Sequence, residues 1–183
     1  MKCPCGTIKE NKVLPKGNEK PLLYLVGEAA GRQEIQYNRP FVGPAGQVLR
    51  KALKETVLKH TNRVRVGNVV LCRPTNNWGN NRTPTYEEID NCVEHVIQDI
   101  TRAAPKLIVL LGKSAAYGIM KRTLPMSQLC KQTDIFTKAT VWYTYHPSYI
   151  MRLKSEEAFN DYCSFWNKVT EYLICNQPFF SQV

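Results

Sequence analysis

The stretch that decides the fold runs from residue 22 to residue 31 and reads LLYLVGEAAG. Its first six residues form an uninterrupted apolar run that follows Pro21 and ends in a glycine turn, a pattern typical of a strand buried on both faces. The chain continues as Gly27-Glu28-Ala29-Ala30-Gly31, so a short polar motif stands directly at the end of this run. We therefore expect the first central strand of a parallel sheet, with a candidate site at its carboxyl end.

Three later apolar runs repeat this arrangement, at residues 64–72, 107–111 and 141–145. Asn68 lies within the first of them. The second ends at Gly112-Lys113-Ser114, a tight turn suited to phosphate, and the third leads into His146-Pro147-Ser148. Because parallel strands bring their carboxyl ends to one edge of the sheet, we expect these segments to converge there.

Helical periodicity appears between the apolar runs, in residues 47–59, in residues 85–100 and after Ser155. Thr85 and Glu88 form a capping box at the start of the second helix. The alternation predicts an α/β fold, a single-domain three-layer α/β/α sandwich around a central, mainly parallel sheet of about four strands. At 183 residues the chain has room for one such domain, with residues 1–20 as a cysteine-bearing segment packed on it.

The chain is strongly basic, with 25 Lys and Arg against 15 Asp and Glu and a formal charge of +10. Such an excess attracts polyanions and makes DNA the natural partner, although solubility alone accounts for it equally well. No long apolar core follows Lys2, and no stretch approaches the roughly 20 apolar residues that a membrane-spanning helix needs. We expect a cytoplasmic monomer, on the nucleoid or in an infected host cell, with any replication or repair partner left open.

Seven cysteines, an odd number without a signal peptide, favour a reducing compartment in which thiols bind metals or pack. Cys3 and Cys5 precede the first strand, Cys72 ends the second, and Cys92 lies in the helix that follows. Two local pairs of soft thiolates suit an iron–sulfur cluster or a tetrahedral zinc ion.

Three motifs together resemble the uracil-DNA glycosylase superfamily, most closely the family 4 branch, whose members carry an iron–sulfur cluster. They are Gly27-Glu28-Ala29-Ala30-Gly31 with Arg39-Pro40-Phe41-Val42-Gly43-Pro44-Ala45-Gly46, then Asn68-Val69-Val70-Leu71-Cys72-Arg73-Pro74, then Tyr145-His146-Pro147-Ser148-Tyr149. The resemblance covers nearly the whole chain. It implies a DNA repair enzyme, a monofunctional hydrolase that cleaves the N-glycosidic bond of uracil in DNA and leaves an abasic site.

The same resemblance implies a [4Fe-4S] cluster held by Cys3, Cys5, Cys72 and Cys92. Two departures from the family pattern affect this ligand set: Cys3-Pro4-Cys5 replaces a usual Cys-x-x-Cys, and the segment between Cys72 and Cys92 is expanded within residues 76–81. Zinc or no metal therefore stays open as an alternative. Ala30 separately replaces a usual proline, which removes no functional group.

For base recognition, the resemblance implies that Phe41 stacks on a flipped-out uracil and that Asn68 reads the edge of the base. Glu34 matches the position that crowds C5 of the pyrimidine, which would reject thymine through its methyl group.

For the chemistry, the resemblance implies that His146 donates a hydrogen bond to uracil O2 while charge builds on the leaving base. Glu28 and the backbone of Ala29 would position the attacking water. Asn68 completes the expected catalytic set.

For DNA, the resemblance implies phosphate contacts and an apolar wedge that holds the gap left by the flipped nucleotide. The phosphate contacts are Lys113, Ser114, Ser148 and Arg152, and the wedge comprises Tyr149, Ile150 and Met151. Neither the preference for single or double strands nor activity on other deaminated bases follows from these residues.

A different class stays open, a glycosylase fold that serves as a DNA-binding or replication-accessory subunit with weak or no catalysis. Glu28, Phe41, Asn68 and His146 are all intact, which favours the enzyme, because a binding module needs no base pocket. A nucleotide-binding α/β enzyme is a weaker alternative, since neither a Walker A loop nor a dinucleotide fingerprint is present.

Overall fold

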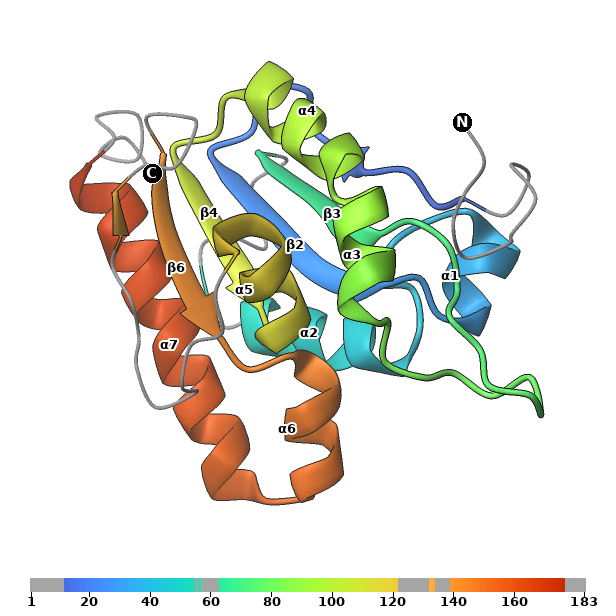
Figure 1. Cartoon of the computed structure of the whole chain (residues 1–183). Coiled ribbons are helices and arrows are strands. Elements are labelled where there is room, and N and C mark those ends of the chain that lie inside the picture. Colours follow the sequence, from blue (N-terminus) through green and yellow to red (C-terminus); the bar gives the residue numbers. More distant parts are fainter. Residues whose placement is uncertain (1–11, 55, 57–62, 122–131, 134–138, 177–183) are drawn as a thin grey trace.

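The computed structural model describes residues 12–54, 56, 63–121, 132–133 and 139–176. They form a six-stranded sheet with strand order β1-β3-β2-β4-β6-β5 (Figure 1). The four longer strands are parallel: β2 (Leu23–Ala29), β3 (Val64–Val70), β4 (Leu107–Leu111) and β6 (Thr140–Thr144). They confirm the predicted sheet of about four parallel strands.

Two short strands, β1 (Lys16–Gly17) and β5 (Gln132–Thr133), add antiparallel edges to this sheet. The sequence does not predict them, because two residues are too few to show an alternating pattern.

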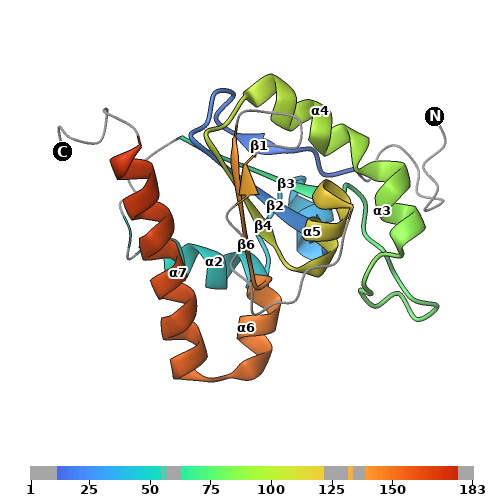
Figure 2. The same cartoon turned by 60° about the vertical axis from the view of Figure 1, so that its left-hand side comes forward.

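Helices cover both faces of the sheet and make the predicted three layers (Figure 2). One face carries α3 (Tyr86–Cys92), α4 (Glu94–Ala103) and α5 (Lys113–Met120). The other carries α2 (Pro44–Lys54), α6 (Pro147–Leu153) and α7 (Glu156–Cys175), while α1 (Arg32–Tyr37) follows β2. Across the described ranges, none of these helices has the length and apolar character needed to cross a membrane.

The core lies on both faces of the sheet, which explains the uninterrupted apolar runs. In β2, Tyr24 and Val26 pack into the cluster under α3, α4 and α5, whereas Leu23 and Leu25 pack into the cluster under α2 and α7. Successive side chains of a strand point to opposite faces, so a strand covered on both sides must be apolar at every position.

The helices differ from the predicted ones at their boundaries. The capping box of Thr85 and Glu88 is confirmed, but the helix expected over residues 85–100 is two helices, α3 and α4, which meet at Val93. The helix expected over residues 47–59 is α2, which starts at Pro44 because proline suits the first position of a helix. Residues 57–59 of that expected helix lie outside the described part. Ser155 caps α7 as predicted and accepts a hydrogen bond from the amide of Ala158.

Candidate active site

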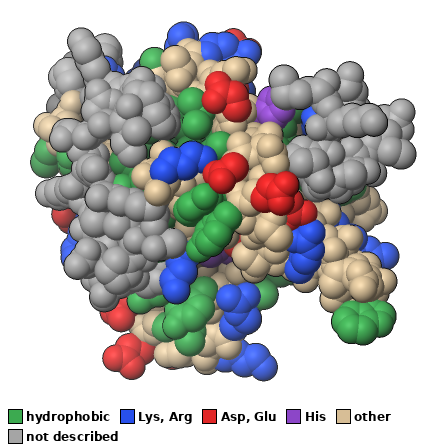
Figure 3. All heavy atoms as spheres, viewed as in Figure 1, with side chains coloured by type: hydrophobic (Ala, Val, Ile, Leu, Met, Phe, Trp, Pro, Cys, Tyr) green, Lys and Arg blue, Asp and Glu red, His purple; other side chains and the backbone are tan. Residues whose placement is uncertain are grey.

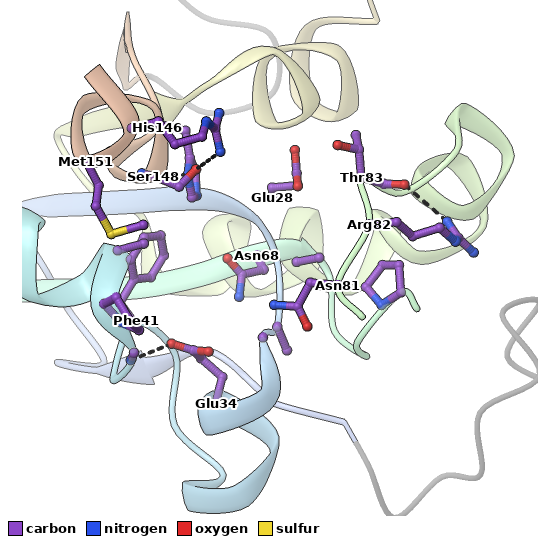
Figure 4. A pocket seen from close by; sticks show the side chains of 18 residues that line it. Glu28, Glu34, Phe41, Asn68, Asn81, Arg82, Thr83, His146, Ser148 and Met151 are labelled. Atoms are coloured by element: carbon purple, nitrogen blue, oxygen red, sulfur yellow. Dashed lines mark hydrogen bonds between the residues drawn. The ribbon is translucent and has the colours of Figure 1, made fainter. Parts of the chain in front are cut away.

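The carboxyl ends of β2, β3 and β6 open into a pocket of about 370 Å³ (Figure 4). Glu28 comes from β2, Asn68 from β3, and His146 from the turn between β6 and α6. All three line the pocket, so the predicted convergence at one edge of the sheet is confirmed. Ala29, Glu34 and Phe41 also line it.

Phe41 forms a buried aromatic wall that the main chain holds in place. Its φ angle is +55°, a left-handed conformation uncommon for a bulky residue, and its carbonyl accepts a hydrogen bond of 2.6 Å from Nη1 of Arg50. A Cβ atom at Gly46 would collide with this carbonyl, and one at Gly27 would collide with the side chains of Phe41 and Asn68. The two glycines thus permit the close approach that shapes the wall.

Glu34 fills the space beside this wall. Its Oε1 atom accepts a hydrogen bond of 2.7 Å from the amide of Gly43. A Cβ atom at Gly31 would lie 2.6 Å from Oε2, so the absence of a side chain there leaves room for the carboxylate. Figure 4 shows the carboxylate below Phe41, at the rim of the pocket.

His146 caps the N-terminus of α6 with its own side chain. Its Nδ1 atom accepts a hydrogen bond of 3.2 Å from the amide of Ser148, and the Ser148 hydroxyl lies 2.8 Å from the same atom. Burial, together with the charge of Arg152, lowers the pKa of His146 to about 4. The imidazole is therefore neutral at pH 7, and because Nδ1 accepts, its proton is on Nε2.

Glu28 is half-buried near the middle of the pocket, opposite Asn68 (Figure 4). Burial raises the pKa of Glu28, and the hydrogen bond from Ser114 and the charge of Arg152 lower it only in part. The Ser114 hydroxyl donates 2.6 Å to Oε2. One carboxylate oxygen is thus held by α5 while the other is left for a ligand or a water molecule.

The residues predicted to contact DNA lie in and around α6 and the start of α5. Ser148, Met151 and Arg152 line the pocket, and Nη1 of Arg152 lies 3.4 Å from the Ser148 hydroxyl. Tyr149 is 40% exposed and stacks on Tyr145 with ring centroids 5.0 Å apart.

Ile150 cannot belong to a DNA wedge, which corrects the prediction. It points from α6 into the core, where it is only 5% exposed. The three predicted wedge residues are consecutive positions of one helix, and consecutive helical positions cannot all face outward. Lys113 is exposed at the start of α5, whereas Ser114 next to it is buried and directed at Glu28, a partner that sequence reasoning did not assign to it.

The sequence analysis did not predict one wall of the pocket. It comprises Pro74, Asn81, Arg82 and Thr83 from the loop between β3 and α3, and it faces His146 and Phe41 across the cavity (Figure 4). Arg82 binds both oxygens of the Glu88 carboxylate, at 2.6 and 2.7 Å. The capping box at Thr85 and Glu88 was the available signal, because it fixes where the loop must return to the domain.

Two of the four predicted metal ligands fall within the described residues, and both are buried in the same core cluster: Cys72, fully buried, and Cys92, 4% exposed. The amide of Leu71, the residue before Cys72, donates a hydrogen bond of 3.3 Å to Sγ of Cys92. Cys3 and Cys5 lie outside the described residues. Among the described residues there is no group of three or more His, Cys, Asp or Glu side chains placed to hold a metal.

Comparison with known proteins agrees with this site. Residues 14–170 match the profile of the uracil DNA glycosylase superfamily. The chain is 36% identical over 159 residues to a type-4 uracil-DNA glycosylase of Pyrobaculum aerophilum, covering 82% of this chain and 79% of that protein. It is 34% identical over 157 residues to the type-4 uracil-DNA glycosylase of Thermotoga maritima, covering 85% and 79%. An enzyme of the same name from Archaeoglobus fulgidus is 40% identical over 118 residues, 64% of this chain and 57% of the relative.

All three motifs line a pocket at the carboxyl ends of parallel strands, and the relatives match most of the length of the chain. The chain therefore belongs to the uracil DNA glycosylase superfamily.

Proposed function

We propose that this protein is a uracil-DNA glycosylase, which hydrolyses the N-glycosidic bond of uracil in DNA and leaves an abasic site. The observation that carries the proposal is a neutral His146 whose Nε2 hydrogen is available beside a pocket walled by Phe41 and Asn68. The relatives that match most of the chain are named for this activity.

Base recognition falls to three residues of the pocket. The Phe41 ring offers a flat surface for a flipped-out base, and the Asn68 side chain, 3% exposed, offers a donor and an acceptor in one plane. Such a two-point contact discriminates against a wrong base by about 1–3 kcal/mol. The Glu34 carboxylate, held by Gly43, is placed to meet the methyl group that distinguishes thymine from uracil.

His146 is the proposed electrophile. When the glycosidic bond breaks, negative charge develops on the leaving base, and an Nε2–H group directed at O2 stabilises it. A neutral donor suits this task at pH 7 because its orientation is fixed beforehand by the Ser148 amide. The Ser148 hydroxyl serves the same end, since it lies 2.8 Å from Nδ1, on the opposite side of the imidazole from Nε2. Arg152 in turn lies 3.4 Å from that hydroxyl.

Glu28 is proposed to position the attacking water, together with the backbone of Ala29. Its Oε2 is held by Ser114, which leaves Oε1 as an acceptor toward the pocket. The sugar becomes positively charged as the base leaves, so a nearby carboxylate also stabilises that state electrostatically.

DNA is proposed to be gripped around α6, which carries Ser148, Tyr149, Met151 and Arg152, and at exposed Lys113 on α5. Base extrusion costs a few kcal/mol, which stacking, phosphate contacts and a wedge must offset. Of the three residues predicted for that wedge, Met151 and Tyr149 are 43% and 40% exposed and remain available for it.

We also propose that Cys72 and Cys92, together with Cys3 and Cys5, hold a [4Fe-4S] cluster. The Leu71 amide that donates to Cys92 Sγ suits a thiolate, whose charge such bonds stabilise. The Val13 amide bonds to the carbonyl of the same Leu71 at 2.8 Å, which ties the chain eight residues after Cys5 to this region. The cluster would cross-link the N-terminal segment to β3 and α3. Iron and sulfide analysis of anaerobically purified protein tests this, because zinc or no metal would contradict it.

The test of the function is alkali-revealed strand scission of an end-labelled oligonucleotide that carries one uracil, beside matched thymine and hypoxanthine substrates. We expect scission at uracil. A His146→Ala variant, purified in the same way, controls for contaminating glycosylase and should be about 10²–10³-fold slower, as when one preorganised donor is removed. DNA binding without scission by the wild-type protein would contradict the proposal and favour the accessory-subunit alternative.

A further inference from the structure

The loop between β3 and α3 carries a tryptophan at its tip that does not pack into the core. Trp78 is 85% exposed, whereas the other two tryptophans, Trp142 and Trp166, are 8% and 0% exposed and belong to the core under α7. The loop projects beyond α3 at the lower right of Figure 1, and in Figure 3 it ends in hydrophobic atoms on that side. We call residues 73–83 the Trp78 loop.

The Trp78 loop is held by its own hydrogen bonds. Oδ1 of Asn76 accepts from the amides of Trp78 and Asn80, at 3.1 and 2.9 Å, and the amide of Asn76 donates to the carbonyl of Asn80 at 2.9 Å. Below the tip, Arg73 donates to Asn81 and to the carbonyl of Gly79. The indole is therefore presented on an ordered support, so little conformational entropy remains to be lost when it binds a partner.

The same loop is a wall of the pocket. Asn81, Arg82 and Thr83 line the cavity, and Trp78 precedes Asn81 by only three residues. Three residues span at most about 11 Å between Cα atoms. A strand whose uracil occupies the pocket therefore brings its neighbouring nucleotides within reach of the indole.

The charge of the loop fits a polyanion. The bonds of Arg73 go to two neutral groups, the Asn81 side chain and the Gly79 carbonyl, so they leave its positive charge in place, whereas Arg82 forms an ion pair with Glu88. The whole chain has a formal charge of +10. Arg73 and Arg82 are both engaged in holding the loop, which leaves the flat face of Trp78 as its most prominent contact group. An exposed aromatic ring in basic surroundings is the usual platform on which proteins stack unpaired bases.

We propose that Trp78 stacks on an unpaired base of the strand that flanks the flipped uracil, so that the Trp78 loop favours uracil in single-stranded DNA. In a duplex, paired bases are covered on both faces by their neighbours, except where they border the gap left by the flipped uracil, and the proposed wedge of α6 fills that gap. An unpaired flanking base offers a free face to Trp78. This inference rests on the proposed function for the position of the strand, but binding itself is measured without any excision.

Tryptophan fluorescence tests the contact directly, because Trp78 is the exposed tryptophan and the other two are buried. Titration with a uracil-free single-stranded oligonucleotide should quench the emission of the wild-type protein. Trp78→Ala should lose this quenching and bind the oligonucleotide about 10-fold more weakly by fluorescence anisotropy, as expected when one base stack is removed. Trp78→Phe, which keeps an aromatic face, should bind with intermediate affinity.

The matched control is Asn77→Ala, an exposed neighbour in the same loop, which should bind like the wild type. Equal binding by Trp78→Ala and the wild type would overturn the proposal. Equal weakening of single-stranded and duplex binding in Trp78→Ala would also overturn it, since it would show a general contact rather than stacking on an unpaired base.

A set of uracil oligonucleotides, each with one abasic spacer at a different position near the uracil, locates the stacked base. In the wild type, one spacer position should slow excision about 10-fold, and in Trp78→Ala the same spacer should have no further effect. If the wild type quenches with single-stranded DNA but excises nothing, the proposed function fails while the stacking surface stands. If excision is normal and no spacer position depends on Trp78, the stacking fails alone.

Discussion

Strands β2 and β3 carry polar side chains at both ends of the sheet, and the two ends differ in what those side chains contact. At the amino end, Tyr24 of β2 lies beside Arg65 of β3, and both bind Asp99 of α4. At the carboxyl end, Glu28 and Asn68 line the pocket. The first group is closed on itself, while the second is open to a ligand.

The pKa values of the two carboxylates express this difference. Asp99 accepts four hydrogen bonds, from Tyr24, Arg65 and Arg102, and these partners hold its pKa below the ordinary value despite burial. Glu28 accepts one from Ser114, and burial raises its pKa. Buried polar groups whose partners all belong to the protein support the fold, whereas those with remaining capacity beside a cavity are available for chemistry.

The largest expected effect is a loss of stability at the amino end of the strands, which we call the closed end; the carboxyl end with the pocket is the open end. Asp99→Ala would leave Arg65 buried without its carboxylate and should lower the free energy of unfolding by about 3–5 kcal/mol, measured by urea denaturation. Arg102→Ala, which removes a partner with a 75% exposed side chain, is the control and should cost no more than about 1 kcal/mol. At a temperature where Asp99→Ala is folded, its excision rate should stay near that of the wild type. A large loss of activity in the folded variant would break the comparison, because it would make the closed end functional.

The open end should respond in the reverse way. The Asn68 side chain lines the pocket, so Asn68→Ala removes a group that faces the ligand rather than one that supports the fold. We expect the loss of transition-state stabilisation to be about 1–3 kcal/mol, which lowers kcat/KM for uracil about 5- to 160-fold, with little change in the free energy of unfolding. Asn160→Ala, at an exposed position of α7, serves as the control. If Asn68→Ala unfolds as readily as Asp99→Ala, the two ends do not differ as described.

A smaller and opposite effect on stability is expected at Glu28. Because its pKa is raised in the folded state, the charged carboxylate opposes folding above that pKa, and this penalty disappears as the pH falls below the ordinary carboxyl pKa. Glu28→Gln should therefore raise the free energy of unfolding at pH 7 by about 1 kcal/mol while it slows excision. The two proteins should converge in stability at acid pH. Glu171→Gln, an exposed change on α7, is the matched control and should leave the free energy of unfolding at pH 7 near that of the wild type. Destabilisation by Glu28→Gln at pH 7 would contradict the assignment.

The sequence predicted those features whose determinants lie close together in the chain. The apolar run of β2 showed a strand covered on both faces, and the turn after it placed Glu28 at the strand end. The capping box of α3 lies within four residues, and it is present.

Contacts between distant residues left no such local signal. Ser114 is 86 positions from Glu28, and Tyr24 is 75 positions from Asp99, so neither partnership is visible as a spacing. The break at Val93 was missed for a different reason. Apolar residues keep their helical spacing through the joint between α3 and α4, and Val93 itself keeps a right-handed helical backbone, so the pattern predicts one helix.

The left-handed backbone of Phe41 has a consequence for how the enzyme turns over. A non-glycine residue in this region is disfavoured by about 1–2 kcal/mol, and here the turn closed by Gly46 and Arg50 enforces it. The ring is thus set by the main chain rather than chosen by a side-chain search when a base arrives. The energetic cost of orienting the Phe41 ring is incurred once, as the polypeptide folds. Each catalytic cycle then begins with the aromatic face already in position.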